Sequence, residues 1–541
     1  MSRGSPGVGT VSLTVVVALV TALALTFALA APGATATSQP RFVAVYPDPV
    51  THDDVGEFVV VSFPRKTNLS GWTLSDGETA VGLSNRRVEG QVAFSTAPAK
   101  TRTLTDYQVL PLSGTVSLAN GGETVRLRRN GTVAAVTYPD ATEGEIWATS
   151  TGEWRPLGAT DRPPASADAE RARAFVLPDA PGIPVETLRS ADDRVLLAAY
   201  TLTSRRVADA LAAAERRGVQ VRVLVDGGPV GGISRREANV LNSLVRDGVS
   251  VEVIGGERAR YEFHHAKYAV VDDRALVLTE NWKPAGTGGH GSRGWGVVVP
   301  GETAQELAAV FRADAGWNDT RSWQQFRRGR SFEPASPANE TYPARFDPET
   351  VPVESVTLVT APDNAESTVV SLLRSANDSV RVEQMSVGGP RQPFVQATLT
   401  AARRGVEVRV LLSGAWYVEE ENRELVRWLN QRADDEGLPL EAKLADPRGY
   451  EKIHAKGVVV DGEHVVVGSL NWNNHSARQN REVAVVLHGE KAGRYYGRVF
   501  DADWRASGGG SRLPLGLAVV VAVGLVAAAA LARREVRFER G

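Results

Sequence analysis

The sequence predicts a multidomain protein: an immunoglobulin-like β-sandwich, two α/β/α repeats packed as a pseudo-twofold bilobal unit, and a C-terminal transmembrane helix. The main observation is an internal duplication, in which AAAERRGVQVRVLVDG at residues 212–227 is answered by LTAARRGVEVRVLLSG at residues 399–414. Each copy is a helix ending at Gly218 or Gly405, followed by a continuous apolar strand typical of a buried parallel sheet. The chain therefore contains two copies of one α/β unit. Short alternating strands precede the duplication, and a long apolar run follows it.

Residues 1–37 are expected to be a secretory signal peptide. They contain one arginine, an apolar run over residues 11–31, and small residues at Ala34 and Ala36 that suit cleavage. The apolar run is long for a signal peptide, so a retained N-terminal anchor is the alternative. Both interpretations export the bulk of the protein.

Residues 40–154 are expected to form the sandwich, because short alternating strands are separated by turn residues, with a hairpin at Asn130 and Gly131. Two segments, EFVVVSFPRKTNLSGWTLSDG and LANGGETVRLRRNGTVAAVTY, resemble the lamin-tail domain. That resemblance implies a binding or spacing module rather than an enzyme. A linker is predicted at residues 155–172.

The duplicated region also repeats a chemical motif. Residues 263–282 read FHHAKYAVVDDRALVLTENW, and residues 452–472 read KIHAKGVVVDGEHVVVGSLNW. Both copies hold a histidine and a lysine two residues apart, which places the two side chains on one face of a strand. An imidazole beside an ammonium group suits phosphate binding and acid/base or nucleophilic chemistry. The candidate catalytic residues are His265, Lys267 and Asp272 in the first copy and His454, Lys456 and Asp461 in the second.

The second copy matches the signature of the phospholipase D superfamily: histidine, one residue, lysine, four residues, aspartate, six residues, then Gly-Ser-x-Asn. The resemblance covers roughly residues 175–487. The first copy is one residue shorter after its aspartate, and it has Leu278 and Thr279 where the second has Gly468 and Ser469. Threonine keeps the hydroxyl group, so the chemistry is expected to survive this change.

The resemblance implies a metal-independent phosphodiesterase without a cofactor. Its two repeats, residues 173–328 and 353–508 joined by a linker at 329–352, would face each other around one phosphate. Two lysines would stabilise the phosphate oxygens, while one imidazole attacks phosphorus and the other protonates the leaving oxygen, through a phosphohistidine. The expected substrate-binding residues are Thr279, Asn281, Ser469 and Asn471. A degenerate pair kept only for folding is the alternative.

Unequal repeats suggest different roles for the two histidines. Glu482 matches the family carboxylate that orients a motif histidine, whereas the first repeat has Gly294 at that position. A carboxylate favours a protonated imidazole, which suits a general acid. We therefore predict that His454 is the acid and His265 the nucleophile.

Residues 513–532 are expected to span a membrane once, because about 20 apolar residues cross a bilayer. The basic tail at residues 533–541 would remain cytoplasmic, which makes this a cell-membrane protein with its catalytic body outside. A buried core helix is the alternative, which the terminal position disfavours.

Phospholipid is the favoured phosphodiester substrate, because the anchor would hold the site near lipid headgroups. An extracellular nuclease and an inactive surface-binding protein are the alternatives, although a net charge of -2 gives no overall attraction to nucleic acid. The absence of cysteine excludes disulfides, thiol catalysis and cysteine-ligated metals. The two repeats are expected to pair within one chain, and no obligate oligomer is implied.

Overall fold

The computed structural model describes Met1 and residues 39–255 and 260–507. The predicted signal peptide beyond Met1, the predicted span at 513–532 and the basic tail at 533–541 lie outside these residues. Within the described ranges, no helix combines the length and the apolar character that a membrane crossing needs.

The N-terminal domain is built from two β-sheets that share one core. A six-stranded sheet has the order β10-β9-β1-β2-β5-β6, and a four-stranded sheet has the order β4-β3-β7-β8. Its elements are β1 (Arg41–Tyr46), η1 (His52–Asp54), β2 (Phe58–Asn68), β3 (Thr73–Ser75), β4 (Ala80–Gly82), β5 (Arg87–Ser95), α2 (Pro98–Leu104), β6 (Gln108–Pro111), β7 (Glu123–Arg128), β8 (Thr132–Tyr138), β9 (Glu145–Ala148) and β10 (Glu153–Pro156). The predicted hairpin at Asn130 and Gly131 is confirmed: it joins β7 to β8, and both residues have positive φ, as such turns require. The resemblance to the lamin-tail family stays a prediction.

The first α/β unit contains a nine-stranded sheet of order β19-β15-β14-β13-β16-β17-β18-β12-β20. Its strands are β12 (Arg171–Leu177), β13 (Arg194–Ala199), β14 (Gln220–Asp226), β15 (Ser250–Ile254), β16 (Tyr268–Val271), β17 (Arg274–Leu278), β18 (Gly294–Pro300), β19 (Thr320–Ser322) and β20 (Glu349–Pro352). Its helices are α3 (Gly182–Arg189), α4 (Arg205–Arg216), α5 (Arg235–Arg246), α6 (Glu302–Ala315) and α7 (Trp323–Phe326). Strands β13, β14 and β15 are parallel, as their continuous apolar runs predict.

The second unit repeats this arrangement in an eight-stranded sheet of order β11-β21-β27-β26-β25-β22-β23-β24. Its strands are β11 (Ala165–Asp168), β21 (Ser355–Ala361), β22 (Ser379–Gln384), β23 (Glu407–Leu412), β24 (Leu440–Leu444), β25 (Lys456–Val460), β26 (His464–Gly468) and β27 (Glu482–His488). Its helices are α8 (Ala365–Ser375), α9 (Pro393–Arg403), α10 (Glu419–Glu436) and α11 (Glu490–Ala506), with a π-helical turn, η2 (His475–Gln479). Gly218 and Gly405 both have φ of 94°, which confirms that they end the two equivalent helices.

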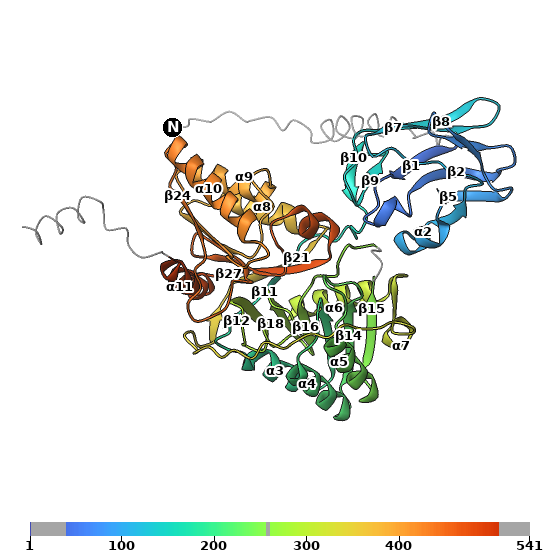
Figure 1. The fold of residues 1–541 in the computed structure, drawn as a ribbon. Coiled ribbons are helices and arrows are strands. Elements are labelled where there is room, and N and C mark those ends of the chain that lie inside the picture. Colours follow the sequence, from blue (N-terminus) through green and yellow to red (C-terminus); the bar gives the residue numbers. More distant parts are fainter. Residues whose placement is uncertain (2–38, 256–259, 508–541) are drawn as a thin grey trace, which may run out of the picture.

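The two units are packed face to face. Helices α3–α5 and α8–α10 cover opposite outer sides of the pair, as Figure 1 shows. Helices α6 and α11 lie between the two sheets, where Phe311 and Phe500 join one buried core that includes strands of both units. This arrangement confirms the predicted pair of α/β units.

Each expected linker contains a strand that lies next to one α/β unit in the sequence but joins the sheet of the other unit. Strand β11, inside the expected linker at 155–172, pairs with β21 of the second unit. Strand β20, at the end of the expected linker at 329–352, pairs with β12 of the first unit. Parts of both expected linkers are therefore sheet strands, and backbone groups at each outer sheet edge gain hydrogen-bonded partners by this exchange.

Two interface arginines, Arg293 and Arg481, also join the units. Arg481 of the second unit lies 3.1 Å from Asp314 on α6 and 2.8 Å from Asp363. Arg293 of the first unit contacts Asp503 on α11, at 2.7 Å, and Asp179. All of these side chains are buried, so each positive charge is compensated by two carboxylates, one of them from the other unit.

Candidate active site

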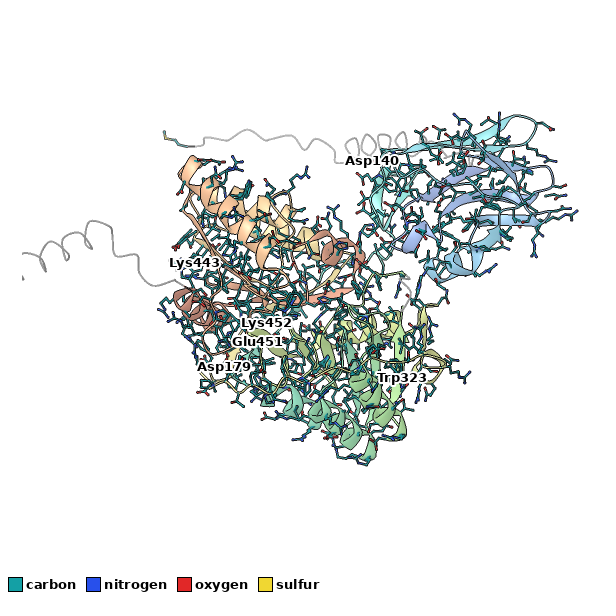
Figure 2. The ribbon with its side chains drawn as sticks, in the orientation of Figure 1. Asp140, Asp179, Trp323, Lys443, Glu451 and Lys452 are labelled. Atoms are coloured by element: carbon teal, nitrogen blue, oxygen red, sulfur yellow. The ribbon has the colours of Figure 1, made fainter. Side chains whose placement is uncertain are left out.

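Both motif histidines lie in extended segments just before β16 and β25, where each pairs with the opposite unit. The backbone N–H of His265 donates to the carbonyl of Arg481 at 2.9 Å, and the N–H of Arg481 donates to Phe263 at 2.9 Å. The second unit repeats this pairing, because the N–H of His454 donates to Arg293 at 2.9 Å. Figure 2 places Glu451 and Lys452, just before His454, at the junction of the units. The fold therefore brings both histidines to one boundary.

Electrostatic coupling shows that the two histidines and two lysines share one site. Burial, together with Lys267 and Lys456, lowers the pKa of His265 to about 4 against the opposing effect of Glu482. Burial also holds the pKa of His454 well below its ordinary value, and the same two lysines and His265 add to the effect. Both shifts favour the neutral form of the imidazoles.

The side chain of Glu482 contacts the histidine of the other unit. His265 Nδ1 lies 2.9 Å and 3.0 Å from the two carboxylate oxygens. Burial alone would raise the pKa of Glu482, but His265 and Lys267 outweigh it and the pKa is lowered. An ionised carboxylate accepts a hydrogen bond from Nδ1–H, so Nε2 is left as the free basic nitrogen of His265. The reason for giving His454 the acid role, a carboxylate supplied by Glu482, does not hold, because domain pairing directs Glu482 to His265.

His454 has a different set of partners on its Nδ1. The carbonyl oxygen of Thr279 lies 3.0 Å away, and the ammonium group of Lys456 lies 3.2 Å away. A carboxylate oxygen of Glu280, a buried residue, lies 3.4 Å from the same nitrogen. A carbonyl can only accept and an ammonium group can only donate, so Nδ1 bonds to Thr279 when it carries a proton and to Lys456 when it does not.

The lysines are anchored beside their histidines. Lys456 Nζ donates to the carbonyl oxygen of His454 at 2.8 Å, and Lys267 Nζ donates to that of His265. Lys267 also lies 5.0 Å from the centre of the Tyr200 ring, which packs against His265. Burial lowers the pKa of Lys456 to about 8, although Glu280 and Glu482 oppose the shift. These contacts hold two ammonium groups beside the imidazoles, and neither ammonium group makes a hydrogen bond to a carboxylate of residues 39–255 or 260–507.

The four predicted substrate-binding residues divide into two groups. The Thr279 hydroxyl accepts the backbone N–H of Trp295 at 2.9 Å, and the Ser469 hydroxyl accepts that of Val483 at 3.1 Å. Both hydroxyl groups therefore bond to the backbone of the neighbouring strand and hold the strand ends together. The amide oxygens of Asn281 and Asn471 are buried without a hydrogen-bond partner in the described part of the chain, so they remain available to a ligand.

Asp272 and Asp461 lie at the far ends of β16 and β25 from the histidines. Asp272 accepts backbone N–H groups of Asp192, Asp193 and Arg194 at 2.9–3.0 Å. Asp461 accepts those of residues 377–379 in the same way. Each aspartate thus fixes the turn before the first parallel strand of its unit.

Replacing Asp272 by alanine is expected to lower the free energy of unfolding by about 1–3 kcal/mol, because three backbone donors lose their acceptor at a partly exposed site. The rate constant kcat is expected to change less than tenfold, because the site chemistry is remote. Thermal unfolding and steady-state kinetics check both expectations. Asp273→Ala is the control, because its side chain is 78% exposed. A large loss of kcat at unchanged stability would contradict the structural role.

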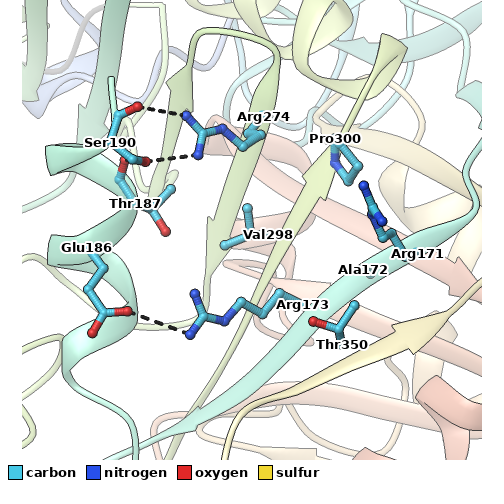
Figure 3. A pocket seen from close by; sticks show the side chains of 10 residues that line it. All are labelled: Arg171, Ala172, Arg173, Glu186, Thr187, Ser190, Arg274, Val298, Pro300 and Thr350. Carbon is cyan, nitrogen blue, oxygen red and sulfur yellow. Dashed lines mark hydrogen bonds and ion pairs between the residues drawn. The ribbon is translucent and has the colours of Figure 1, made fainter. Parts of the chain in front are cut away.

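The pocket in Figure 3 does not belong to this site. It has a volume of about 400 Å³ and lies among α3, β12, β17 and β18. Its residue Arg274 begins β17, whereas Thr279 follows the opposite end of that strand. Arg274 donates to Ser190 and pairs with Asp272 at 3.4 Å, and Arg173 pairs with Glu186 at 3.6 Å, so two of its arginines are compensated locally.

Sequence reasoning missed Glu280, Lys283 and the two interface arginines. The arginines carried a signal, because SRGWGVVV and NREVAVVL both place arginine before the position of Gly294 or Glu482. Lys283, whose pKa burial lowers, carried no comparable signal because it has no lysine counterpart in the second motif. No group of three or more His, Cys, Asp or Glu side chains suited to a metal ion occurs in residues 39–255 and 260–507.

The fold and the site define a duplicated α/β protein with one shared centre of two histidines and two lysines. Residues 185–315 and 369–504 both match the family profile described as cardiolipin synthase, PLD-like domain. The two α/β units therefore belong to the phospholipase D-like superfamily.

The comparisons also give individual relatives. Cardiolipin synthase A of Yersinia pseudotuberculosis serotype O:1b and that of Yersinia pestis are each 24% identical over 321 residues, which is 55% of this chain and 60% of theirs. The chain thus spans three fifths of the length of these relatives. Phosphatidylserine synthase of Haemophilus influenzae gives a TM-score of 0.49 at 13% identity, over 64% of this chain and 89% of that one. Nuc of Salmonella typhimurium gives a TM-score of 0.25 at 21% identity, over 29% and 99%.

Proposed function

We propose that this protein is a phosphodiesterase of the phospholipase D type that hydrolyses or transfers the phosphodiester of a phospholipid. The observation that carries the proposal is the shared centre, in which each histidine pairs with the opposite unit and both lysines act on both imidazoles. Its relatives named cardiolipin synthase A support the lipid substrate. We also propose that the protein is exported and anchored through residues 513–532, with the site outside the cell.

The first step of the proposed reaction forms a bond from Nε2 of His265 to phosphorus and breaks the bond from phosphorus to the leaving oxygen. Glu482 holds Nδ1–H and leaves the Nε2 lone pair free, so it favours His265 as the nucleophile. His454 donates the proton to the leaving oxygen. A bound phosphodiester carries negative charge, which raises the pKa of the neutral His454 and supplies the protonated form that an acid requires.

The second step uses the same groups in reverse. Water or an alcohol attacks phosphorus, its proton passes to His454, and the bond from phosphorus to His265 breaks. Lys267 and Lys456 stabilise the negative charge on the remaining phosphate oxygens in both steps. These ammonium groups supply electrostatic stabilisation from the chain itself. Water gives hydrolysis, and a lipid hydroxyl group gives phosphatidyl transfer.

Two exposed loops beside the site support a lipid substrate. In the first unit, Val230 is 81% exposed on the loop after β14, and its N–H donates to Tyr200, the residue packed on His265. In the second unit, Trp416 is 85% exposed on the loop after β23, the strand equivalent to β14. The neighbouring Tyr417 lies 5.3 Å from Lys452, two residues before His454. Exposed aromatic and aliphatic side chains on both sides of a phosphate site suit contact with a lipid surface.

An extracellular nuclease is the second candidate, because Trp416 could equally stack on an unpaired base. The full chain, incubated with chelator, should release headgroup or form a new phosphatidyl product from phosphatidylglycerol vesicles. Single-stranded DNA should remain intact. Trp416→Ala should reduce activity on vesicles several-fold more than on a short-chain soluble phospholipid. Cleavage of DNA with no reaction on vesicles would favour the nuclease, and inactivity on both would leave the binding role.

A further inference from the structure

The two units supply a carboxylate to the shared site from different positions. In the second unit the carboxylate is Glu482, directly after Arg481, and the residue before Asn471 is Leu470. In the first unit the equivalent positions are reversed. Glycine follows Arg293, and an acid, Glu280, precedes Asn281. Position 280 thus corresponds to position 470, and position 294 corresponds to position 482. The first unit has its acid at the earlier position of the pair, and the second unit has its acid at the later one.

The glycine at position 294 makes room for the displaced acid. A Cβ atom built on Gly294 would lie 2.2 Å from Cγ of Glu280 and 2.9 Å from its Cδ. The side chain of Glu280 therefore fills the space that a side chain at position 294 would occupy. Gly294 does not have a positive φ, so its backbone conformation does not itself require glycine. Gly286 approaches from another side, where a Cβ would lie 2.7 Å from Oε2 of Glu280.

Glu280 is an unusual group to bury without a function. It is 0% exposed, and both of its carboxylate oxygens lack a hydrogen-bond partner among the described residues. Burial raises its pKa to about 7 against the opposing effect of Lys456, Lys283 and Lys267. A buried acid without hydrogen bonds costs several kcal/mol of stability in typical proteins. Oε2 is nevertheless directed at the site, 3.4 Å from His454 Nδ1.

We propose that Glu280 is the positioning carboxylate of His454, acting from the end of β17 as Glu482 acts on His265 from the start of β27. In the first unit the acid stands at position 280 rather than at position 294, and its target histidine lies in the other unit in both cases. The role of Glu280 in turnover rests on the function proposed above. The contact between Glu280 and His454 is independent of that function.

Two single variants test the contact. Glu280→Gln keeps the shape of the side chain and removes its charge, whereas Glu280→Leu copies Leu470. Each should lower kcat about 100-fold or more, by analogy with other carboxylate–histidine pairs. The change should be in kcat rather than KM, and the pH profile should shift. Glu490→Gln, at a side chain that is 78% exposed, is the matched control and should leave activity unchanged.

The decisive variant transposes the acid. In Glu280→Leu with Gly294→Glu, the first unit acquires the arrangement of the second, and kcat should recover to within about tenfold of the parent. If Glu280 only filled space, kcat would not recover, because a carboxylate at position 294 would then supply nothing that turnover needs.

Titration of the histidine ring nitrogens by NMR, in the full chain labelled with ¹⁵N-histidine, gives a readout that needs no substrate. Glu280→Gln should change the tautomer ratio or pKa of His454 and leave those of His265 unchanged. No change at His454 would overturn the proposal, whether or not the transposed variant folds. If the parent protein is inactive on every phosphodiester while this titration behaves as expected, the proposed function fails and the contact stands.

Discussion

Replacing His265 by alanine is expected to reduce phosphodiester turnover by about 10⁴-fold or more, because the variant loses the atom that forms the covalent intermediate. Replacing His454 instead should slow release of the leaving group and water activation, since no acid or base remains at that position. With a substrate whose leaving group needs no proton, His454→Ala should accumulate a phosphoryl or phosphatidyl group on His265. Rapid quench followed by peptide mass spectrometry locates the modified histidine.

The control for both variants is His290→Ala, because His290 contacts the carbonyl of Glu340 and lies outside the paired motif segments. Its activity and circular dichroism should match the parent protein. Accumulation of the intermediate on His454 in His265→Ala would reverse the two roles. Full activity in His265→Ala would refute the covalent mechanism.

Replacing Asp314 by alanine is expected to destabilise the paired units by about 3–5 kcal/mol, because Arg481 and Arg260 each lose a buried carboxylate partner. Asp314 lies 3.1 Å from Arg481, 3.2 Å from His264 and 3.6 Å from Arg260. Denaturant unfolding measures the loss. Glu490→Ala, which removes an exposed pair with Arg494, should change stability by less than about 0.5 kcal/mol.

The contribution of Asp314 also depends on pH. Burial would raise its pKa, but Arg481 and His264 outweigh burial and hold the pKa well below the ordinary value. A carboxyl group with a lowered folded-state pKa contributes stability that is complete above its unfolded value of about 3.9 and disappears as pH falls further. The difference in stability between the parent and Asp314→Ala should therefore shrink below about pH 4. A difference that is constant from pH 7 to pH 3 would contradict this electrostatic origin.

Residue patterns predicted the duplicated unit and its histidine–lysine pairs because these features are local. A helix ending at glycine, an apolar parallel strand and a two-residue spacing are each visible within about 20 residues. The hairpin at Asn130 and Gly131 followed from the same kind of local signal. The resemblance then supplied the expectation that the units face each other.

The partners of the histidines could not be predicted in this way. Glu482 lies 28 residues after His454 in the chain, yet its side chain contacts His265, because the segment carrying Arg481 pairs with the other unit. Glu280 occupies a variable position of the signature, and only the space beside Gly294 reveals that it replaces a missing acid. The backbone partners of Asp272 and Asp461 could not be predicted either, because the signature does not separate residues that hold turns from residues that touch substrate.

The exchange of β11 and β20 has a consequence for how the protein is made. The outer edge of the first sheet is completed by β20, which the ribosome produces about 170 residues after β12. The second sheet needs β11, which is synthesised before any of its other strands. Dividing the chain after β20 would leave the second sheet without its edge strand β11, so this exchange favours keeping both repeats on one polypeptide.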